Sequence, residues 1–101
     1  MSKQKTKNKQ TAKDKVILEW TDVAWDDYLH GYQNSETYFE KINSFIEECK
    51  RTPFKGIGKP EPLANNLTGY WSRRISMEHR FIYFYQDKRL TVIACRYRYG
   101  D

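Results

Sequence analysis

The chain has no long apolar run and few of the residues that build cofactor sites. Its 101 residues include only two cysteines and two histidines. No apolar stretch approaches the ~18 residues of a membrane-spanning helix. The basic N-terminus lacks the apolar core of a secretory signal peptide. These absences predict a cytoplasmic protein that does not enter a membrane.

The two cysteines, Cys49 and Cys95, stand far apart in apolar surroundings. Neither belongs to a Cys-x-x-Cys pair, and no cluster of cysteine and histidine has the spacing of a zinc site. The glycines match neither a phosphate-binding loop nor a dinucleotide fingerprint. We therefore expect no metal and no cofactor. Two buried, reduced thiols are the favoured interpretation, and a single disulfide is the alternative.

The net charge of +5 is unevenly distributed along the chain. Residues 1–15 hold six lysines and almost no apolar side chain, which predicts a disordered lysine-rich tail. That tail is either a solvated extension or a non-specific tether to nucleic acid. Residues 16–101 are long enough for one domain. Within it, residues 16–48 are acidic and residues 49–101 are basic, so the basic half is the candidate surface for a polyanion.

The spacing of apolar residues predicts a strand at residues 16–20 and then two amphipathic helices up to about residue 51. In the first helix one apolar stripe contains Trp25, Tyr28, Leu29 and Tyr32. Asp27 lies off this stripe, so we expect its carboxylate to be solvated. A loop that contains all three prolines of the chain follows, to about residue 63.

The stretch from Tyr70 to Tyr85 consists of two runs rich in aromatic and β-branched residues around a polar link, which predicts a β-hairpin. A last strand runs from Arg89 to Tyr97. The order β-α-α-β-β-β predicts an α+β fold, a small twisted and mainly antiparallel sheet with two helices packed on one face. The hairpin carries three arginines and one histidine, which suit contacts with phosphates and bases.

Several motifs between Val16 and Tyr99 closely resemble the YoeB toxins of the RelE superfamily. They are Trp25–Tyr28, Arg51–Phe54, Gly56–Leu63, Asn66–Leu67, Trp71–Ile75, His79–Arg80 and Ala94–Tyr97. The resemblance implies a RelE-like fold and a ribosome-dependent endoribonuclease that cuts mRNA in the A site of the 70S ribosome. It implies a YefM-type antitoxin as partner, with operator DNA contacted only through that antitoxin. Whether the chain forms a homodimer stays open.

RNA cleavage without a metal uses the 2′-hydroxyl of the substrate as nucleophile, and it needs a base, cationic support for the phosphorane and a proton donor. By resemblance, Glu61 is the general base and Arg80 supports the phosphate. Arg74 matches a second active-site arginine, since a planar guanidinium that stays charged suits this role. The candidates for contacts with the RNA backbone are Lys55, Lys59 and Arg73.

The two arginines share a face of the hairpin only in one register. If Arg74 pairs with Arg80, both side chains project to the same side. A tight two-residue turn at Met77-Glu78 would pair Ile75 with Arg80 instead and would separate the arginines. His79 adjoins Arg80 and should point away from it, so we expect a structural or surface histidine.

The end of the chain departs from the family. YoeB toxins end in Tyr-His-Tyr, and that histidine serves as general acid, whereas this chain has Tyr97-Arg98-Tyr99. Arginine is a poor proton donor near neutral pH but a good charge stabiliser. Three interpretations follow: Arg98 stabilises the leaving oxygen, Tyr99 donates the proton, or the protein is a weak or silent relative that acts through antitoxin binding and co-repression. Tyr99 is also a candidate for stacking on a base.

Overall fold

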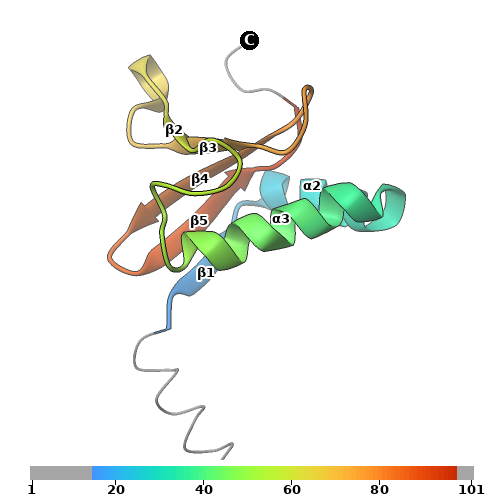
Figure 1. The fold of residues 1–101 in the computed structure, drawn as a ribbon, viewed down its shortest axis with the longest axis horizontal. Coiled ribbons are helices and arrows are strands. Elements are labelled where there is room, and N and C mark those ends of the chain that lie inside the picture. The colour runs from blue at the N-terminus through green and yellow to red at the C-terminus, as the bar shows by residue number, and fades with distance from the viewer. Residues whose placement is uncertain (1–14, 98–101) are drawn as a thin grey trace, which may run out of the picture.

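A computed structural model describes residues 15–97 (Figure 1), so most of the predicted lysine-rich tail lies outside the described residues. The elements in chain order are β1 (Ile17–Trp20), α2 (Asp22–Asn34), α3 (Glu36–Cys49), β2 (Glu61–Pro62), the 3-10 helix η1 (Asn65–Leu67), β3 (Trp71–Arg74), β4 (Arg80–Gln86) and β5 (Arg89–Ala94). They agree with the predicted order except for β2.

The five strands form one sheet in the order β1-β5-β4-β3-β2. Strand β1 runs parallel to β5, and the other neighbours are antiparallel. Helices α2 and α3 lie on one side of this sheet, which confirms the predicted α+β fold. The two-residue strand β2 was missed because two residues carry no alternation. Its proline is tolerated because β2 is an edge strand.

The core lies between α3 and the central strands. On α3 the buried side chains recur with helical spacing, at Ile42, Phe45, Ile46 and Cys49. They join a cluster that the strands complete with Phe81, Tyr83, Leu90 and Val92. Because α2 and α3 both pack on this side, the other face of the sheet carries no α-helix of the described residues, and alternate strand residues point toward it. That free face carries the candidate site.

Helix α2 buries only part of the stripe predicted for it, since Tyr28 packs against the core. Trp25 is 45% exposed and Tyr32 is 68% exposed, whereas the buried residues of α2 are Ala24 and Gly31. The physical reason is close helix packing, because a Cβ atom on Gly31 would lie 2.4 Å from the ring of Tyr38 on α3. Ala24 and Gly31 therefore face inward and Tyr28 is half-buried, whereas Trp25 and Tyr32 face outward.

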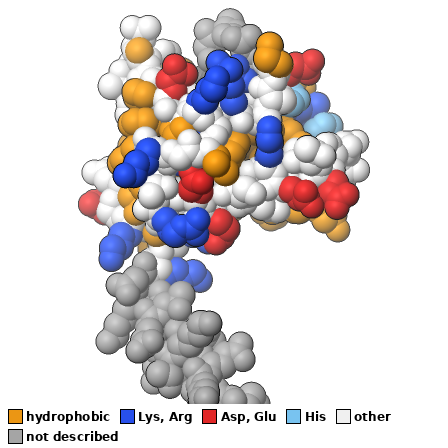
Figure 2. All heavy atoms as spheres, in the orientation of Figure 1, with side chains coloured by type: hydrophobic (Ala, Val, Ile, Leu, Met, Phe, Trp, Pro, Cys, Tyr) orange, Lys and Arg blue, Asp and Glu red, His pale blue; other side chains and the backbone are white. Residues whose placement is uncertain are grey.

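The exposed charges follow the division seen in the sequence. Acidic side chains gather at the helical end of the face shown in Figure 2, at the right of that view. Lysines and arginines lie mainly over the remainder of the same face. The right-hand end of this view is therefore mainly acidic, whereas the remainder carries lysines and arginines interspersed with acidic side chains.

Candidate active site

The face of the sheet opposite the helices presents one carboxylate and two arginines from three neighbouring strands. Glu61 pairs with Ser72, and Arg74 pairs with Arg80. Paired residues project to the same side of a sheet, as do residues two apart on one strand. Because Arg73 points to the helical side, this register places Glu61, Arg74 and Arg80 together on the open face.

The hairpin register meets the condition for a shared face. The pairing of Arg74 with Arg80 is confirmed, and the link between them spans residues 75–79. The backbone N–H groups of Ile75 and Ser76 donate to the carbonyl of His79 at 3.1 and 3.2 Å. The link is therefore longer than a tight two-residue turn and closes on His79.

Hydrogen bonds to the link orient the side chain of Arg80. Its Nη1 donates to the carbonyl oxygens of Ser76 at 2.6 Å and of His79 at 3.1 Å. The side chain of Arg74 is exposed, and its backbone N–H donates to the carbonyl of Gly58 at 2.7 Å. One arginine is thus fixed at the end of the hairpin, while the backbone of the other is tied to the loop before Glu61.

Glu61 is exposed on the edge strand β2. Its position depends on pairing with β3, which continues beyond β2 through a bond from the backbone N–H of Leu63 to the carbonyl of Tyr70 at 2.9 Å. The carboxylate is open to solvent rather than enclosed in the loop. A substrate can therefore approach Glu61 from the same side as the two arginines.

Arg73 does not contribute to this open face. Its side chain is completely buried, and Nη1 lies 2.7 Å from Oε1 of Glu48 on α3. Nη1 and Nη2 also donate to carbonyl oxygens of the proline-containing loop at Thr52, Lys55 and Ile57, at 2.8 to 3.1 Å. The prediction that Arg73 contacts RNA is therefore wrong, because its side chain links the loop to the helix.

Tyr83 completes this buried support for the loop. Its hydroxyl donates to the carbonyl of Pro53 at 2.5 Å and accepts a bond from Nε of Arg73 at 3.3 Å. Burial raises the pKa of Tyr83 to about 12, so the phenol stays protonated near neutral pH and remains a donor. The hydrogen bond from Arg73 lowers the pKa of Glu48, which keeps that carboxylate ionised.

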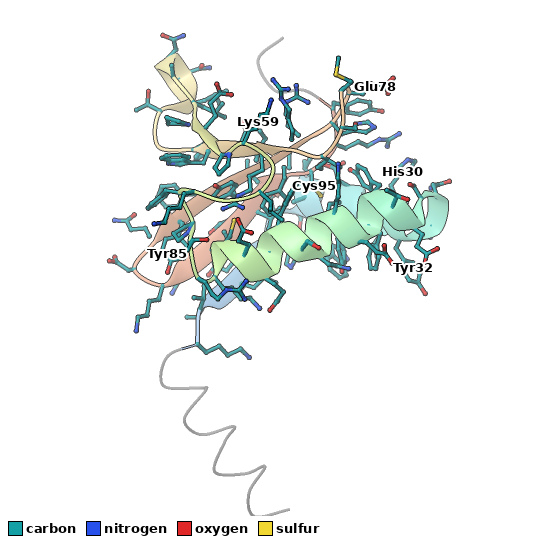
Figure 3. The ribbon with its side chains drawn as sticks, viewed as in Figure 1. His30, Tyr32, Lys59, Glu78, Tyr85 and Cys95 are labelled. Atoms are coloured by element: carbon teal, nitrogen blue, oxygen red, sulfur yellow. The ribbon has the colours of Figure 1, made fainter. Side chains whose placement is uncertain are left out.

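Both lysines predicted to contact RNA are exposed on the same loop. Lys55 is held through its backbone carbonyl by Arg73, at 3.1 Å. Lys59 has a positive φ of 52° and precedes β2 by one residue. Figure 3 shows Lys59 beside the sheet, away from the helical end marked by His30 and Tyr32. Both lysines therefore stay available to an external partner.

The described chain ends beside Arg80. The backbone N–H of Arg80 donates to the carbonyl of Tyr97 at 3.0 Å. The backbone N–H of Tyr97 donates in turn to Nδ1 of His79 at 2.8 Å. The predicted site residues Arg98 and Tyr99 lie outside the described residues, directly after this anchored position.

Asp27 has a role that the sequence reasoning missed. Its Oδ2 accepts a hydrogen bond from the backbone N–H of Cys95 at 3.0 Å, and burial raises the pKa of this carboxyl. The expectation of a solvated carboxylate was therefore wrong. The available signal was helical spacing, since Asp27 shares a helix face with the two small residues Ala24 and Gly31.

Both cysteines are free and buried, as the favoured interpretation predicted. Burial raises the pKa of Cys49 to about 11 and that of Cys95 to about 12, so neither thiol is ionised near neutral pH. Among residues 15–97, no three histidine, cysteine, aspartate or glutamate residues are grouped to hold a metal ion. No helix in this part of the chain has the length and apolar character to span a membrane.

The described residues have a RelE-like fold. At the level of the fold alone, the chain resembles YafQ from Escherichia coli BL21(DE3), with a TM-score of 0.65 at 15% identity. A YoeB/ParE toxin from Agrobacterium tumefaciens superposes with a TM-score of 0.79 at 50% identity, covering 82% of this chain and 99% of that one. A YoeB dimer from Staphylococcus aureus gives a TM-score of 0.79 at 38% identity, covering 84% and 99%.

Sequence comparison narrows the class to one family. Residues 20–99 match the family model of the YoeB-like toxin of bacterial type II toxin–antitoxin systems. Toxin YoeB of Escherichia coli K12 is 50% identical over 82 residues, which cover 81% of this chain and 98% of that protein. Toxin YoeB of a Synechocystis strain is 49% identical over the same length. The chain therefore belongs to the YoeB family of toxins, as the sequence motifs predicted.

Proposed function

We propose that this toxin is a ribosome-dependent endoribonuclease that cleaves mRNA in the ribosomal A site. The observation that carries the proposal is the strand register that gathers Glu61, Arg74 and Arg80 on one open face. An exposed face of this kind does not itself enclose an RNA strand. It suits a substrate that a larger particle, the ribosome, holds in place.

The chemistry assigns one task to each group. Glu61 takes the proton of the 2′-hydroxyl, and the resulting 2′-oxygen attacks the adjacent phosphorus. The guanidinium groups of Arg80 and Arg74 stabilise the negative charge that develops on the phosphorane. The bond to the 5′-oxygen then breaks, leaving a 2′,3′-cyclic phosphate and a 5′-hydroxyl.

The departing 5′-oxygen needs a proton, which the family takes from a histidine. In this chain Tyr99 donates that proton, or water supplies it while Arg98 stabilises the oxygen. Because side chains supply the base and the cationic support, and Tyr99 or water supplies the proton, the proposed mechanism requires no metal or cofactor. Lys55 and Lys59 are proposed to bind RNA backbone phosphates along the loop, where both are exposed.

We propose an antitoxin of the YefM type as the protein partner. A YoeB relative from Staphylococcus aureus, 38% identical to this chain, was solved in a YoeB-YefM complex. The basic region of this chain suits an acidic antitoxin segment, which would cover the open face and displace Arg98 and Tyr99. Contact with operator DNA would occur only through the antitoxin. A complex that leaves the C-terminus uncovered would contradict this arrangement.

We also propose that the chain forms a homodimer through a series of aromatic rings around α2, of which Trp25 and Tyr32 are exposed and would be buried by a second copy. Rings of Trp20, Trp25, Tyr28, Phe39 and Tyr32 form a continuous series, here called the aromatic ladder, with neighbouring centroids 4.6 to 5.7 Å apart. Exposed apolar patches of this kind mark interaction sites. The Staphylococcus aureus relative was solved as a YoeB dimer.

The test maps mRNA ends after incubation of the purified toxin with programmed ribosomes. Cleavage in the A-site codon that disappears in Glu61→Gln and Arg80→Ala supports the proposal. A matched control is Glu78→Gln, since Glu78 lies exposed in the hairpin link. Arrest of translation with intact mRNA would instead identify a silent ribosome-binding relative. The arginine at position 98 is the sequence feature that favours this alternative.

A further inference from the structure

The last described residues are held by side chains from other elements. Pairing between β4 and β5 ends at Ile82 with Ala94, next to a register shift. The following backbone is bound instead by Asp27 of α2, Tyr38 of α3 and His79 of the hairpin link. We call these three side chains the C-terminal clamp.

Two members of the clamp, Asp27 and Tyr38, bind the backbone N–H and the backbone carbonyl of Cys95. Asp27 accepts from the backbone N–H of Cys95 at 3.0 Å, and the hydroxyl of Tyr38 donates to the carbonyl of the same residue. Burial raises the pKa of Tyr38 well above its ordinary value, so the phenol remains a donor. These bonds fix where the chain leaves the sheet.

His79 connects this segment to Arg80. Its Nδ1 accepts from the backbone N–H of Tyr97 at 2.8 Å, while its own carbonyl accepts from Nη1 of Arg80 at 3.1 Å. Its ring packs edge-on against Tyr38 and Tyr97, with centroids 5.3 and 5.7 Å away. One residue thus contacts both the phosphate-binding arginine and the segment that precedes Arg98.

We propose that His79 is a positioning residue for the reaction, because Nδ1 fixes the backbone of Tyr97 relative to Arg80. An accepting Nδ1 requires an unprotonated nitrogen at that position. His79 itself neither touches the scissile phosphate nor transfers a proton in this scheme. The inference rests on the proposed endoribonuclease function, since only that function gives Arg98 and Tyr99 a task in the site.

Two variants of His79 separate the effect of its hydrogen-bond acceptor from the effect of its aromatic ring. His79→Phe keeps an aromatic ring between the two tyrosines but removes the acceptor, whereas His79→Asn restores an acceptor at the δ position without the ring. His30→Phe is the matched control, because Nδ1 of His30 lies 3.3 Å from the side-chain amide of Asn34, one turn further along the same helix. Ribosome affinity, single-turnover cleavage and hydrogen exchange of the Tyr97 amide are measured for each variant.

We expect His79→Phe to lower the cleavage rate at saturating toxin by about 10- to 100-fold, as small displacements of reacting groups do. Ribosome affinity should be unchanged, and the Tyr97 amide should exchange faster. His79→Asn should recover most of the rate and of the amide protection, and His30→Phe should match the wild type. This rescue distinguishes positioning from a general loss of fold stability.

The result that would overturn the inference depends on whether the wild-type protein cleaves mRNA. If His79→Phe cleaves at the wild-type rate while Glu61→Gln is inactive, the clamp has no part in the reaction and the proposed function stands. If the wild type itself cleaves no mRNA, the proposed function fails. Amide exchange then decides the remaining claim, and unchanged exchange at Tyr97 in His79→Phe would refute the anchoring role of His79.

Discussion

Arg73 of β3 and Glu48 of α3 form an ion pair in which Nη1 and Oε1 are 2.7 Å apart and the guanidinium is completely buried. Oε1 of Glu48 also accepts from the backbone N–H of Ile57, at 2.7 Å. Together with the carbonyl bonds of Arg73, the pair ties the loop before Glu61 to the core. A proposed catalytic carboxylate on a short edge strand thereby gains a rigid support.

Replacement of Arg73 by methionine should destabilise the fold by about 3 kcal/mol or more, because several loop carbonyls lose their donor. Urea unfolding measures this change. The control is Arg89→Met, since Arg89 pairs with Glu19 at the surface with its side chain 54% exposed and should cost within about 1 kcal/mol. Equal losses of unfolding free energy in the two variants would show that the buried network stabilises the fold no more than an exposed ion pair does.

Gly58→Ala should destabilise the fold by about 1–3 kcal/mol through overpacking and backbone strain. Gly58 has φ of +78°, and an added Cβ would lie 2.7 Å from Cζ of Phe45. Since the carbonyl of Gly58 binds the backbone of Arg74 at 2.7 Å, the shift should also slow mRNA cleavage. Thermal unfolding and the cleavage assay measure the two effects.

Gly69→Ala supplies the matched control for this variant. Gly69 also has a positive φ, of +101°, but the nearest atom to its added Cβ is 3.9 Å away. Its variant therefore reports backbone strain without the clash. A loss in Gly58→Ala no larger than that in Gly69→Ala would contradict the argument from packing.

The sequence was sufficient for the elements with strong periodicity and insufficient where tertiary packing decides. Helix α3 and the two strands of the hairpin followed their patterns. The register of the hairpin did not, because the sequence left open whether Arg74 or Ile75 pairs with Arg80, and the five-residue link decides it. The buried face of α2 was predicted only in part, because close packing at Gly31 turns Ala24 and Gly31 inward and leaves Trp25 and Tyr32 exposed. Arg73 resembled a surface arginine, since no local pattern reveals that loop carbonyls and Glu48 surround it.

Asp27→Asn should stabilise the protein relative to the wild type, and more so as pH rises. Burial raises the pKa of Asp27 above its ordinary value of 3.8, so ionisation releases more free energy in the unfolded chain than in the folded one. The wild type therefore loses stability relative to the variant from about pH 4 upward until Asp27 is fully ionised in the fold. The asparagine keeps an oxygen acceptor for Cys95.

Urea unfolding of both proteins between about pH 3 and pH 7 checks this sign, over the range in which carboxyl groups titrate. Asp26→Asn is the control, because Asp26 is the exposed neighbour on the same helix and its removal tests the general effect of one lost negative charge. A wild type that gained stability over Asp27→Asn with rising pH would contradict the argument from burial.

The aromatic ladder predicts a dimer that loses affinity when its exposed rings are removed. Trp25 and Tyr32 are 45% and 68% exposed, and in a symmetric dimer the two copies of each ring together should contribute on the order of 2 kcal/mol. Trp25→Ser and Tyr32→Ser should each raise the dimer Kd by about 30-fold in sedimentation equilibrium. Met77→Ser is the control, because Met77 is 80% exposed in the hairpin link. A Kd unaffected by either ladder variant would place the interface elsewhere.

Replacement of Arg98 by histidine tests which step limits the proposed reaction. If proton donation to the 5′-oxygen is limiting, Arg98→His should raise the single-turnover cleavage rate, within the ~10²–10⁴-fold that general acid catalysis contributes. The rate should then fall at high pH as the imidazole loses its proton, a dependence that arginine does not give. Arg96→His is the control for the introduction of a histidine near the C-terminus. Arg96 precedes Arg98 by two residues, and its guanidinium lies over the ring of Tyr97, 4.7 Å from the centroid. An Arg98→His protein no faster than the wild type would show that Arg98 or Tyr99 already meets the demand of the leaving oxygen.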